Sequence, residues 1–309
     1  MSRIDDDILE LLARQRRDWA MARDGYAALQ RVQTRELSLS GFDVRLQFNP
    51  ARIVSSGAKV DARSVAARPC FLCPRNLPPE QQAVAFDDRW QVLVNPFPIL
   101  PQHFTVPSRD HVPQSIDAAL ASMLRLSMAL GERFVVFYNG PRCGASAPDH
   151  LHLQIGNTGF LPIESQLDDL SCRFGERIDD GLLAIHTPPR RLLLIDAPDA
   201  SRAEQLFVRA LSALPRDVGH EPMINVLCWS QPRRLRLALV PRAKHRPTCY
   251  FASDEARMLI SPGAVDVGGV IVLPLQRDFE RLTGDLLEAA LSEVFLDEGA
   301  FARVISRLR

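Results

Sequence analysis

The chain has 309 residues, of which 46% are hydrophobic and 24% are charged. This composition is ordinary for a globular protein, and the length suffices for one large domain or two smaller ones. The 37 basic and 37 acidic residues cancel, so no overall charge attracts the chain to nucleic acid or to an anionic membrane. An anionic ligand must therefore be bound by a local site, which favours a small molecule over a polymer.

Hydrophobicity and cysteine usage suggest a cellular location. No run of about eighteen apolar residues is present, which excludes a membrane-spanning helix. The first residues are acidic and contain no apolar signal core, so we expect a cytoplasmic protein whose thiols stay reduced. The six cysteines are then better explained as metal ligands or buried residues than as disulfides, and only Cys70 and Cys73 are close in sequence.

The first half is predicted to combine a long N-terminal helix with a sheet. Apolar residues at helical spacing predict a helix over about residues 4–37, which packs on the main body or on a second subunit, so a homodimer is one option. Alternating apolar and polar residues predict a strand at 42–48. Further expected elements are strands at 90–94, 104–106, 134–138 and 150–155, a helix at 115–130 that ends at Gly131, and a loop at 69–79 that holds the cysteine pair.

The second half partly repeats this pattern. A capping box at residues 201–204 predicts a helix to about residue 214. The other expected elements are strands at 224–229, 235–240 and 270–275, and a long helix at 278–296. Residues 240–245 are also similar to residues 106–111. A diverged duplication explains these similarities, although helix–strand–strand is a common arrangement and the shared segment is short.

Three polar side chains are predicted to share one face of the strand at 150–155. Residues two apart in a strand project to the same side, so His150, His152 and Gln154 lie together while Leu151 and Leu153 face the core. An imidazole can attack phosphorus directly if an acceptor holds its other nitrogen. A neutral amide can bind a phosphate oxygen without repelling it.

The loop before this strand suits an anion. Its glycines, Gly140 and Gly144, let backbone N–H groups approach a phosphate closely, and the hydroxyl of Ser146 adds a donor. Taken alone, however, each motif also fits a different chemistry. A His-x-His pair is more often a metal site than a nucleophile, and a Cys-x-x-Cys pair is a redox pair, half of a zinc site or a coincidence.

These features occur together in an order that resembles a known superfamily. Residues 69–74 (Pro-Cys-Phe-Leu-Cys-Pro), 106–111 (Val-Pro-Ser-Arg-Asp-His) and 138–154, which end in His-Leu-His-Leu-Gln, resemble galactose-1-phosphate uridylyltransferase of the histidine-triad superfamily. Dinucleoside polyphosphate phosphorylases and plant GDP-L-galactose phosphorylases of that superfamily are similar too. The resemblance is closest to a bacterial group of unknown function. It covers residues 42–160 well and extends into the C-terminal half through residues 241–247 and 260–264.

The resemblance implies an α+β fold, with a histidine-triad-like antiparallel sheet and packed helices in two related halves. It divides the chain into an N-terminal helical segment (residues 1–40), a catalytic half with a metal site (41–165) and a diverged second half (166–309).

Residue by residue, the resemblance makes His152 the nucleophile. It puts Gln154 in place of the third histidine of the superfamily's hydrolases. Asn139, Gly140, Gly144 and Ser146 are expected to contact the substrate.

The same resemblance implies a structural metal. The positions that match its ligands are Cys70, Cys73, His111 and His150. Two thiolates and two imidazoles form a satisfactory tetrahedral zinc site, and with all four positions filled the ion would not activate water.

Several other residues are open to two interpretations. His103 is either a site residue, because simpler members of the superfamily often have a histidine here, or a half-buried strand residue. Arg52 and Arg109 are candidate phosphate contacts or surface residues. The basic residues at 242–246 bind a substrate phosphate or form a solvated turn.

The expected activity is nucleotidyl transfer or phosphorolysis through a nucleotidyl-histidine. The substrate is a nucleotide, either a nucleoside diphosphate-sugar or a dinucleoside polyphosphate, and the acceptor is phosphate or a sugar phosphate. The alternatives are a nucleotide hydrolase of the same superfamily and a non-catalytic, zinc-stabilised nucleotide-binding module.

Overall fold

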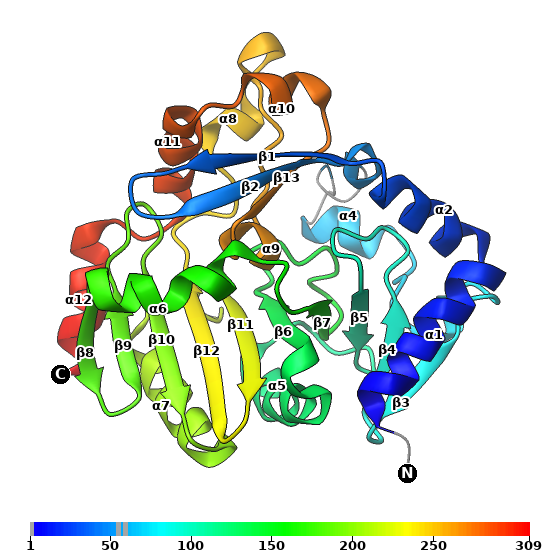
Figure 1. The fold of residues 1–309 in the computed structure, drawn as a ribbon, viewed down its shortest axis with the longest axis horizontal. Helices are drawn as coiled ribbons and strands as arrows, with labels where there is room; N and C mark the ends of the chain where they lie inside the picture. Colours follow the sequence, from blue (N-terminus) through cyan, green and yellow to red (C-terminus); the bar gives the residue numbers. More distant parts are fainter. Residues whose placement is uncertain (1–2, 54–56, 58–60) are drawn as a thin grey trace.

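The computed structural model describes residues 3–53, 57 and 61–309 and has two β-sheets with helices packed on them (Figure 1). The larger sheet has ten strands in the order β3-β4-β5-β7-β6-β11-β12-β10-β9-β8, and all neighbouring strands are antiparallel. In that order their bounds are Ala83–Phe86, Trp90–Val94, His103–Pro107, His152–Asn157, Phe134–Asn139, Ile224–Gln231, Arg234–Pro241, Leu192–Ala197, Leu182–Ile185 and Gly175–Asp179. The predicted α+β class with an antiparallel sheet is confirmed.

The ten strands form two halves with the same topology. From each outer edge to the centre, the strand order is β3-β4-β5-β7-β6 in one half and β8-β9-β10-β12-β11 in the other. In each half a helix connects the third strand to the central strand: α5 (Ile116–Leu130) follows β5 and α7 (Ala200–Ala213) follows β10. The expected pair of related halves is therefore present in the topology. Because β6 and β11 pair at the centre, both halves share one continuous sheet, and the division near residue 165 remains a proposal.

The sequence similarity between residues 106–111 and 240–245 does not reflect this repeat. The first segment ends β5 and the second ends β12. The equivalent of β5 in the second half is β10, so the two segments occupy different positions of the repeat.

The large sheet separates two hydrophobic cores, because successive side chains of a strand face opposite sides. In β6, Phe134, Val136 and Tyr138 lie in one core, whereas Val135 and Phe137 lie in the other. The first core packs against α1, α2, α5, α7 and α12 (Glu298–Leu308). The second is covered by α6 (Pro162–Phe174), α9 (Ala264–Val267), α10, α11 and a three-stranded sheet of β1, β2 (Asp43–Phe48) and β13 (Val270–Leu273).

The N-terminal helix predicted for residues 4–37 is wrong in two respects. The structure has two helices, α1 (Ile4–Asp18) and α2 (Ala20–Leu29), separated by Trp19 in an extended conformation. Trp19 is only 4% exposed, so the break buries a large side chain. Residues Gln33–Ser38 form strand β1, which pairs with β2, so pairing between strands overrides helical spacing there. Both helices pack on the body of the same chain.

Two further helix boundaries differ from the prediction. The residue that caps α7 is Asp199, whose side chain accepts a hydrogen bond from the backbone of Arg202, instead of the predicted Ser201. The helix expected at 278–296 consists of α10 (Gln276–Arg281) and α11 (Gly284–Val294), because Thr283 caps a new helix between them. The remaining short helical segments are Pro50–Arg52, Ala62–Ala66, Pro74–Asn76, Gly131–Arg133, Thr248–Phe251 and Asp254–Ala256.

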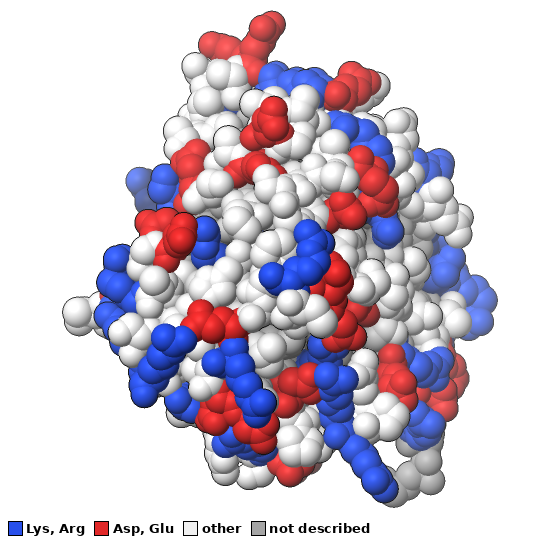
Figure 2. All heavy atoms as spheres, turned by 60° about the vertical axis from the view of Figure 1, so that its left-hand side comes forward, with Lys and Arg blue, Asp and Glu red and all other residues white. Residues whose placement is uncertain are grey.

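Charges are mixed on the molecular face shown in Figure 2. Basic and acidic side chains alternate over this face, and no large area of one sign is visible. On the face shown there is therefore no continuous basic track of the kind that binds a nucleic-acid backbone. Among the described residues, no helix has the length and apolar character needed to cross a bilayer.

Helix α2 packs closely on the body of the protein at Gly25. A Cβ atom at this position would overlap the carbonyl oxygen of Pro96. Replacing glycine by alanine inside a helix ordinarily stabilises it by about 0.5–1 kcal/mol. Here we expect Gly25→Ala to lower the free energy of unfolding, measured in urea, by about 1–3 kcal/mol, because the loop that contains Pro96 must move to make room for the methyl group. Asp24→Ala, at an exposed neighbour, is the control, and a stabilising Gly25→Ala would contradict this packing.

Candidate active site

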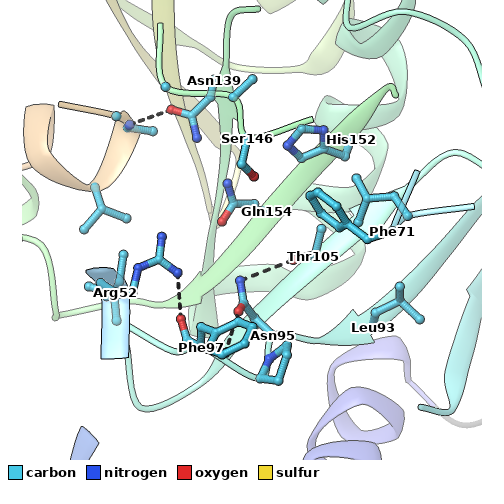
Figure 3. A pocket seen from close by; sticks show the side chains of 18 of the residues that line it. Arg52, Phe71, Leu93, Asn95, Phe97, Thr105, Asn139, Ser146, His152 and Gln154 are labelled. Carbon is cyan, nitrogen blue, oxygen red and sulfur yellow. Dashed lines mark hydrogen bonds between the residues drawn. The ribbon is translucent and has the colours of Figure 1, made fainter. Parts of the chain in front are cut away.

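A cavity of about 720 Å³ lies on the second-core side of β5, β6 and β7 (Figure 3). Three parts of the chain line it. The N-terminal segment contributes Trp19 and Met21. The first half and the C-terminal half contribute a larger set of lining residues, which includes Arg52, Arg68, Phe71, Asn95, Phe97, Asn139, Gly144, Ser146, His152, Gln154, His245, Arg246, Ser261, Gly263 and Asp266.

His152 is the first residue of β7 and borders this cavity. Its Nδ1 donates a hydrogen bond of 2.8 Å to the carbonyl oxygen of His150. A carbonyl oxygen only accepts, so the proton of the neutral ring is on Nδ1 and Nε2 carries a lone pair. Burial lowers the pKa of His152 to about 4, which keeps the ring neutral at neutral pH.

The ring of His152 is only 3% exposed, yet it lies at the cavity wall next to Ser146 (Figure 3). In the described part of the chain, no hydrogen bond occupies its Nε2. Its backbone is held by Gln114, whose side chain accepts from the N–H of His152 and donates to its carbonyl and to that of Asn139. The tautomer and position therefore leave the Nε2 lone pair of His152 at the cavity wall.

Gln154 lies on the same face of β7 as His152, as predicted, and Leu151 and Leu153 lie in the first core. The prediction that His150 shares this face is wrong. His150 precedes β7 in a turn, where its backbone N–H donates to the carbonyl of Ala147. The turn directs its ring toward the cysteine loop, and His150 is not among the residues that line the cavity.

The loop between β6 and β7 contributes unequally to the cavity. Asn139, Gly144 and Ser146 line it, whereas Gly140 does not. Gly144 has φ +98°, and a Cβ atom there would lie 2.8 Å from the Cα of Gly263, so glycine is required for close contact with the second half.

The side chain of Asn139 joins the two halves of the protein at the cavity. Its Oδ1 accepts hydrogen bonds from Asn225 and from the backbone of Ala264. Because Asn139 and Ala264 both line the cavity, these bonds fix two walls relative to each other.

The four predicted metal ligands form one cluster. One ligand atom from each of Cys70, Cys73, His111 and His150 lies within 4.8 Å of the others. Cys70 Sγ is 3.3 Å from His150 Nδ1, and Cys73 Sγ is 3.3 Å from His111 Nδ1. The two Nδ1 atoms are 3.2 Å apart. Two thiols and two imidazoles that converge on one point are the donor set of a tetrahedral metal site.

The outer nitrogens of these histidines support a metal site. His150 Nε2 donates to the carbonyl of Ser108 at 2.8 Å, so its Nδ1 carries the lone pair that points into the cluster. His111 Nε2 lies 3.7 Å from a carboxylate oxygen of Asp149, outside the cluster, and its Nδ1 faces that of His150 at 3.2 Å. The lone pair of His150 Nδ1 and the two thiols are donors suited to a cation at the centre of the cluster. The residues therefore could hold a metal ion.

Among the candidate cations, Arg52 lines the cavity and Arg109 does not. Arg52 donates to the carbonyl of Phe97 at 2.8 Å, and in the described residues it forms no salt bridge. Burial lowers its pKa to about 10, so it stays charged at neutral pH. The guanidinium is partly buried at the cavity wall and forms no direct ion pair with the described residues, although the carboxyl of Asp266 on the same wall is near enough to raise its pKa, so Arg52 is available to an anionic ligand.

The basic residues at 242–246 have three different roles. Arg242 is buried and bonds Asn225 and the carbonyl of Pro262, so it holds the second half together. Lys244 forms a salt bridge with Glu293. His245 and Arg246 line the cavity. This segment is therefore neither a purely solvated turn nor a single phosphate site.

Some residues of the site were not predicted from the sequence. Gln114 holds the start of β7, and its position in a loop before a helix gives no signal of this role. Trp19 and Met21 line the cavity from the N-terminal helices, and the break at Trp19 has no proline or glycine to indicate it. Gly263 and Asp266 come from a segment of the second half whose similarity to the bacterial group did not indicate chemistry.

Comparisons with solved structures show the fold, which is that of a nucleotide phosphorylase of the kind that the sequence resemblance implied. The solved structure of yeast Ap4A phosphorylase Apa2 superposes with a TM-score of 0.63 at 18% identity, over 89% of this chain and 96% of that chain. The same yeast enzyme in complex with Ap4A gives a TM-score of 0.59 at 17% identity, again over 89% and 96%.

Weaker similarities add little to this picture. An ADP-glucose phosphorylase from Arabidopsis thaliana, solved with bound ADP-glucose, covers 86% of this chain and 99% of its own at 17% identity, with a TM-score of 0.37. Residues 11–157, just under half of the chain, match the family described as "Domain of unknown function (DUF4922)". No curated protein matches the sequence significantly.

His103 is predicted to make the stability of the protein depend on pH. Burial and the positive charge of Arg52 lower its pKa from 6.5 to about 3. The unfolded chain binds a proton here below about pH 6.5, whereas the folded chain does so only below about pH 3. Acid therefore favours unfolding across this window, by up to about 1.4 kcal/mol per pH unit from this residue.

The variant His103→Gln, which cannot titrate, isolates this effect. We expect wild type to exceed the variant in free energy of unfolding by more at about pH 7.5 than at about pH 5, measured by urea denaturation. An equal difference at both pH values would contradict the prediction, because it would mean that the folded protein binds the proton as readily as the unfolded chain.

Proposed function

We propose that the protein transfers a nucleotidyl group through a covalent intermediate on His152. Nε2 of His152 attacks the α-phosphorus of a nucleotide, the N–P bond forms, and the bond to the leaving phosphate or sugar phosphate breaks. An oxygen of the acceptor phosphate then attacks the same phosphorus. The new P–O bond forms as the N–P bond breaks, and the electron pair of the N–P bond returns to Nε2 of His152. The observation that carries the proposal is the free Nε2 at the cavity wall, with Nδ1 held by the carbonyl of His150.

The neighbouring groups are suited to a phosphate in this position. Ser146 supplies a hydroxyl and Gln154 a neutral amide beside His152. The guanidinium of Arg52 also points toward the centre of the cavity in Figure 3 and can neutralise charge on a leaving or entering phosphate. Because no third histidine stands in place of Gln154, no imidazole assists water, which favours transfer and phosphorolysis over hydrolysis.

The substrate we propose is a nucleoside diphosphate-sugar or a dinucleoside polyphosphate. The cavity is within the size range of small-molecule sites. It combines apolar side chains such as Trp19, Phe71 and Phe97 with the cationic Arg52 and Arg246, as a ligand with a base and several phosphates requires. The yeast enzyme with the same fold was crystallised with AMP and with Ap4A. Phosphate or a sugar phosphate is the proposed acceptor.

We also propose that Cys70, Cys73, His111 and His150 hold a structural zinc ion. Zinc is the usual partner of two thiolates and two imidazoles, and four protein ligands leave no position for a catalytic water. In the proposed division of the chain, residues 41–165 carry this ion and the nucleophile, and the second half completes the cavity wall.

A covalent adduct tests the proposed chemistry. We expect mass spectrometry to detect a nucleotidyl group on His152 after mixing with nucleotide-sugars or dinucleoside polyphosphates, and phosphate to accelerate its release as a nucleoside diphosphate. His152→Gly should lose the adduct and reduce turnover on the order of 10³-fold or more. His186→Gln, at an ion-paired histidine away from the cavity, is the control. Equal release of nucleoside monophosphate with and without phosphate would indicate a hydrolase, and ligand binding with no adduct a binding module.

Metal analysis tests the zinc site independently. Wild type should contain about one zinc ion per chain, and Cys70→Ala or His150→Ala should lose it because one of four ligands is removed. We expect the loss of the ion to lower the free energy of unfolding of these variants by a few kcal/mol, which corresponds to a fall in Tm of about 10 °C. Cys172→Ala, at an exposed free cysteine, should keep both zinc and Tm. If His152→Gly released the zinc, the roles given to the two histidines would be wrong.

A further inference from the structure

His103 is buried next to the site and has a defined tautomer. Its Nδ1 accepts a hydrogen bond of 3.2 Å from the backbone N–H of Ile99. A backbone N–H only donates, so Nδ1 carries the lone pair and the proton of the neutral ring is on Nε2. The pKa of about 3 keeps the ring in this neutral form at any pH near neutrality.

This tautomer determines which end of the Gln154 amide faces the ring. His103 Nε2 lies 2.9 Å from Oε1 of Gln154 and donates to it. The alternative orientation would place the NH₂ group of Gln154 against an N–H of the ring, which is two donors with no acceptor. The amide oxygen is therefore occupied, and the NH₂ group remains for the cavity. Figure 3 shows the amide nitrogen on the side of Ser146 and His152.

His103 itself is held on several sides. Tyr26 donates its hydroxyl to the carbonyl of His103 at 3.0 Å and accepts from its backbone N–H at 3.2 Å. The segment that contains Ile99 is fixed by Gln47, which donates to the carbonyl of Ile99, and by Asn49, which donates to that of Pro98. Buried polar groups with all partners present form a rigid network. The network therefore holds the ring of His103 in one position, and the ring in turn holds the amide of Gln154 in one orientation.

We propose that His103 is a positioning residue that makes Gln154 present its NH₂ group to the phosphate held at His152, and that this orientation selects phosphate over water as the acceptor. The inference rests on the proposed function and extends it. An NH₂ group donates to a non-bridging phosphate oxygen and stabilises the charge that develops there. It cannot accept a hydrogen bond from water, whereas the amide oxygen can, so the fixed amide offers no acceptor that would orient an attacking water.

The variants His103→Phe and His103→Gln test the proposal. Phenylalanine keeps a buried ring but removes the donor, so the amide of Gln154 is free to rotate. We expect the rate of nucleotidyl-His152 formation to fall about 10–100-fold. We also expect the share of the adduct that water consumes to rise about tenfold relative to the share that phosphate consumes. Glutamine can accept from Ile99 and donate to Gln154, so His103→Gln should restore most of the wild-type ratio.

A control variant and a binding measurement separate positioning from general damage. Phe207→Leu, in the core around α7 and away from the cavity, should lower stability without changing the ratio of phosphate to water. Calorimetric titration with each of the four nucleoside monophosphates should show affinity lowered about tenfold in His103→Phe and unchanged in Phe207→Leu.

Two outcomes would overturn the inference. One is a His103→Phe protein whose acceptor ratio and nucleotide affinity equal those of wild type. The other is a Phe207→Leu protein whose ratio changes as much as that of His103→Phe. Failure of the proposed function is a different result: wild type would bind nucleoside monophosphates and form no adduct, and the binding difference between the two variants would still decide the orientation of Gln154.

Discussion

The site depends on the hydrogen bond from Nδ1 of His152 to the carbonyl of His150. This bond fixes the tautomer of His152, the proposed nucleophile, and also connects it to the cysteine–histidine cluster, because the ring of His150 is a member of that cluster. The ring nitrogens of His150 are both engaged, one by the carbonyl of Ser108 and one by the cluster, so the carbonyl that accepts from His152 belongs to an immobilised residue. The cluster therefore orients the ring of His152 through His150 without itself lining the cavity.

Local sequence patterns predicted part of this arrangement. The alternation of polar and apolar residues placed His152 and Gln154 on one face of β7, and the resemblance named the four residues of the cluster. The period of a strand does not apply before the strand begins, which is why the shared face was wrong for His150. The contact of Tyr26 with His103 joins residues 77 positions apart, and no local pattern indicates such a partner. The break at Trp19 depends likewise on burial in tertiary structure.

The two halves of the repeat have diverged in what they contribute. The first half supplies His152, the proposed nucleophile, and the cysteine–histidine cluster, and the second half contains no His-x-His. Its side chains instead complete the walls: Asn225 bonds Asn139, and Arg242 bonds Asn225 and the carbonyl of Pro262. A chain of buried hydrogen bonds thus connects β6 to the segment around Gly263, across the line where the halves meet. Two halves with the same topology thus form one cavity to which they contribute unequally.

The antiparallel pairing of β6 with β11 limits how the two halves can move relative to each other. Five residue pairs, from Asn225 with Asn139 to Trp229 with Val135, join the halves through the middle of one sheet. Rotation of one half against the other would separate these strands and expose their backbone amides, which is costly. Hinge closure of two rigid lobes is therefore not available to this molecule. A ligand would instead enter and leave the cavity through movements of side chains and short segments at its mouth, which occur on shorter time scales than lobe motions.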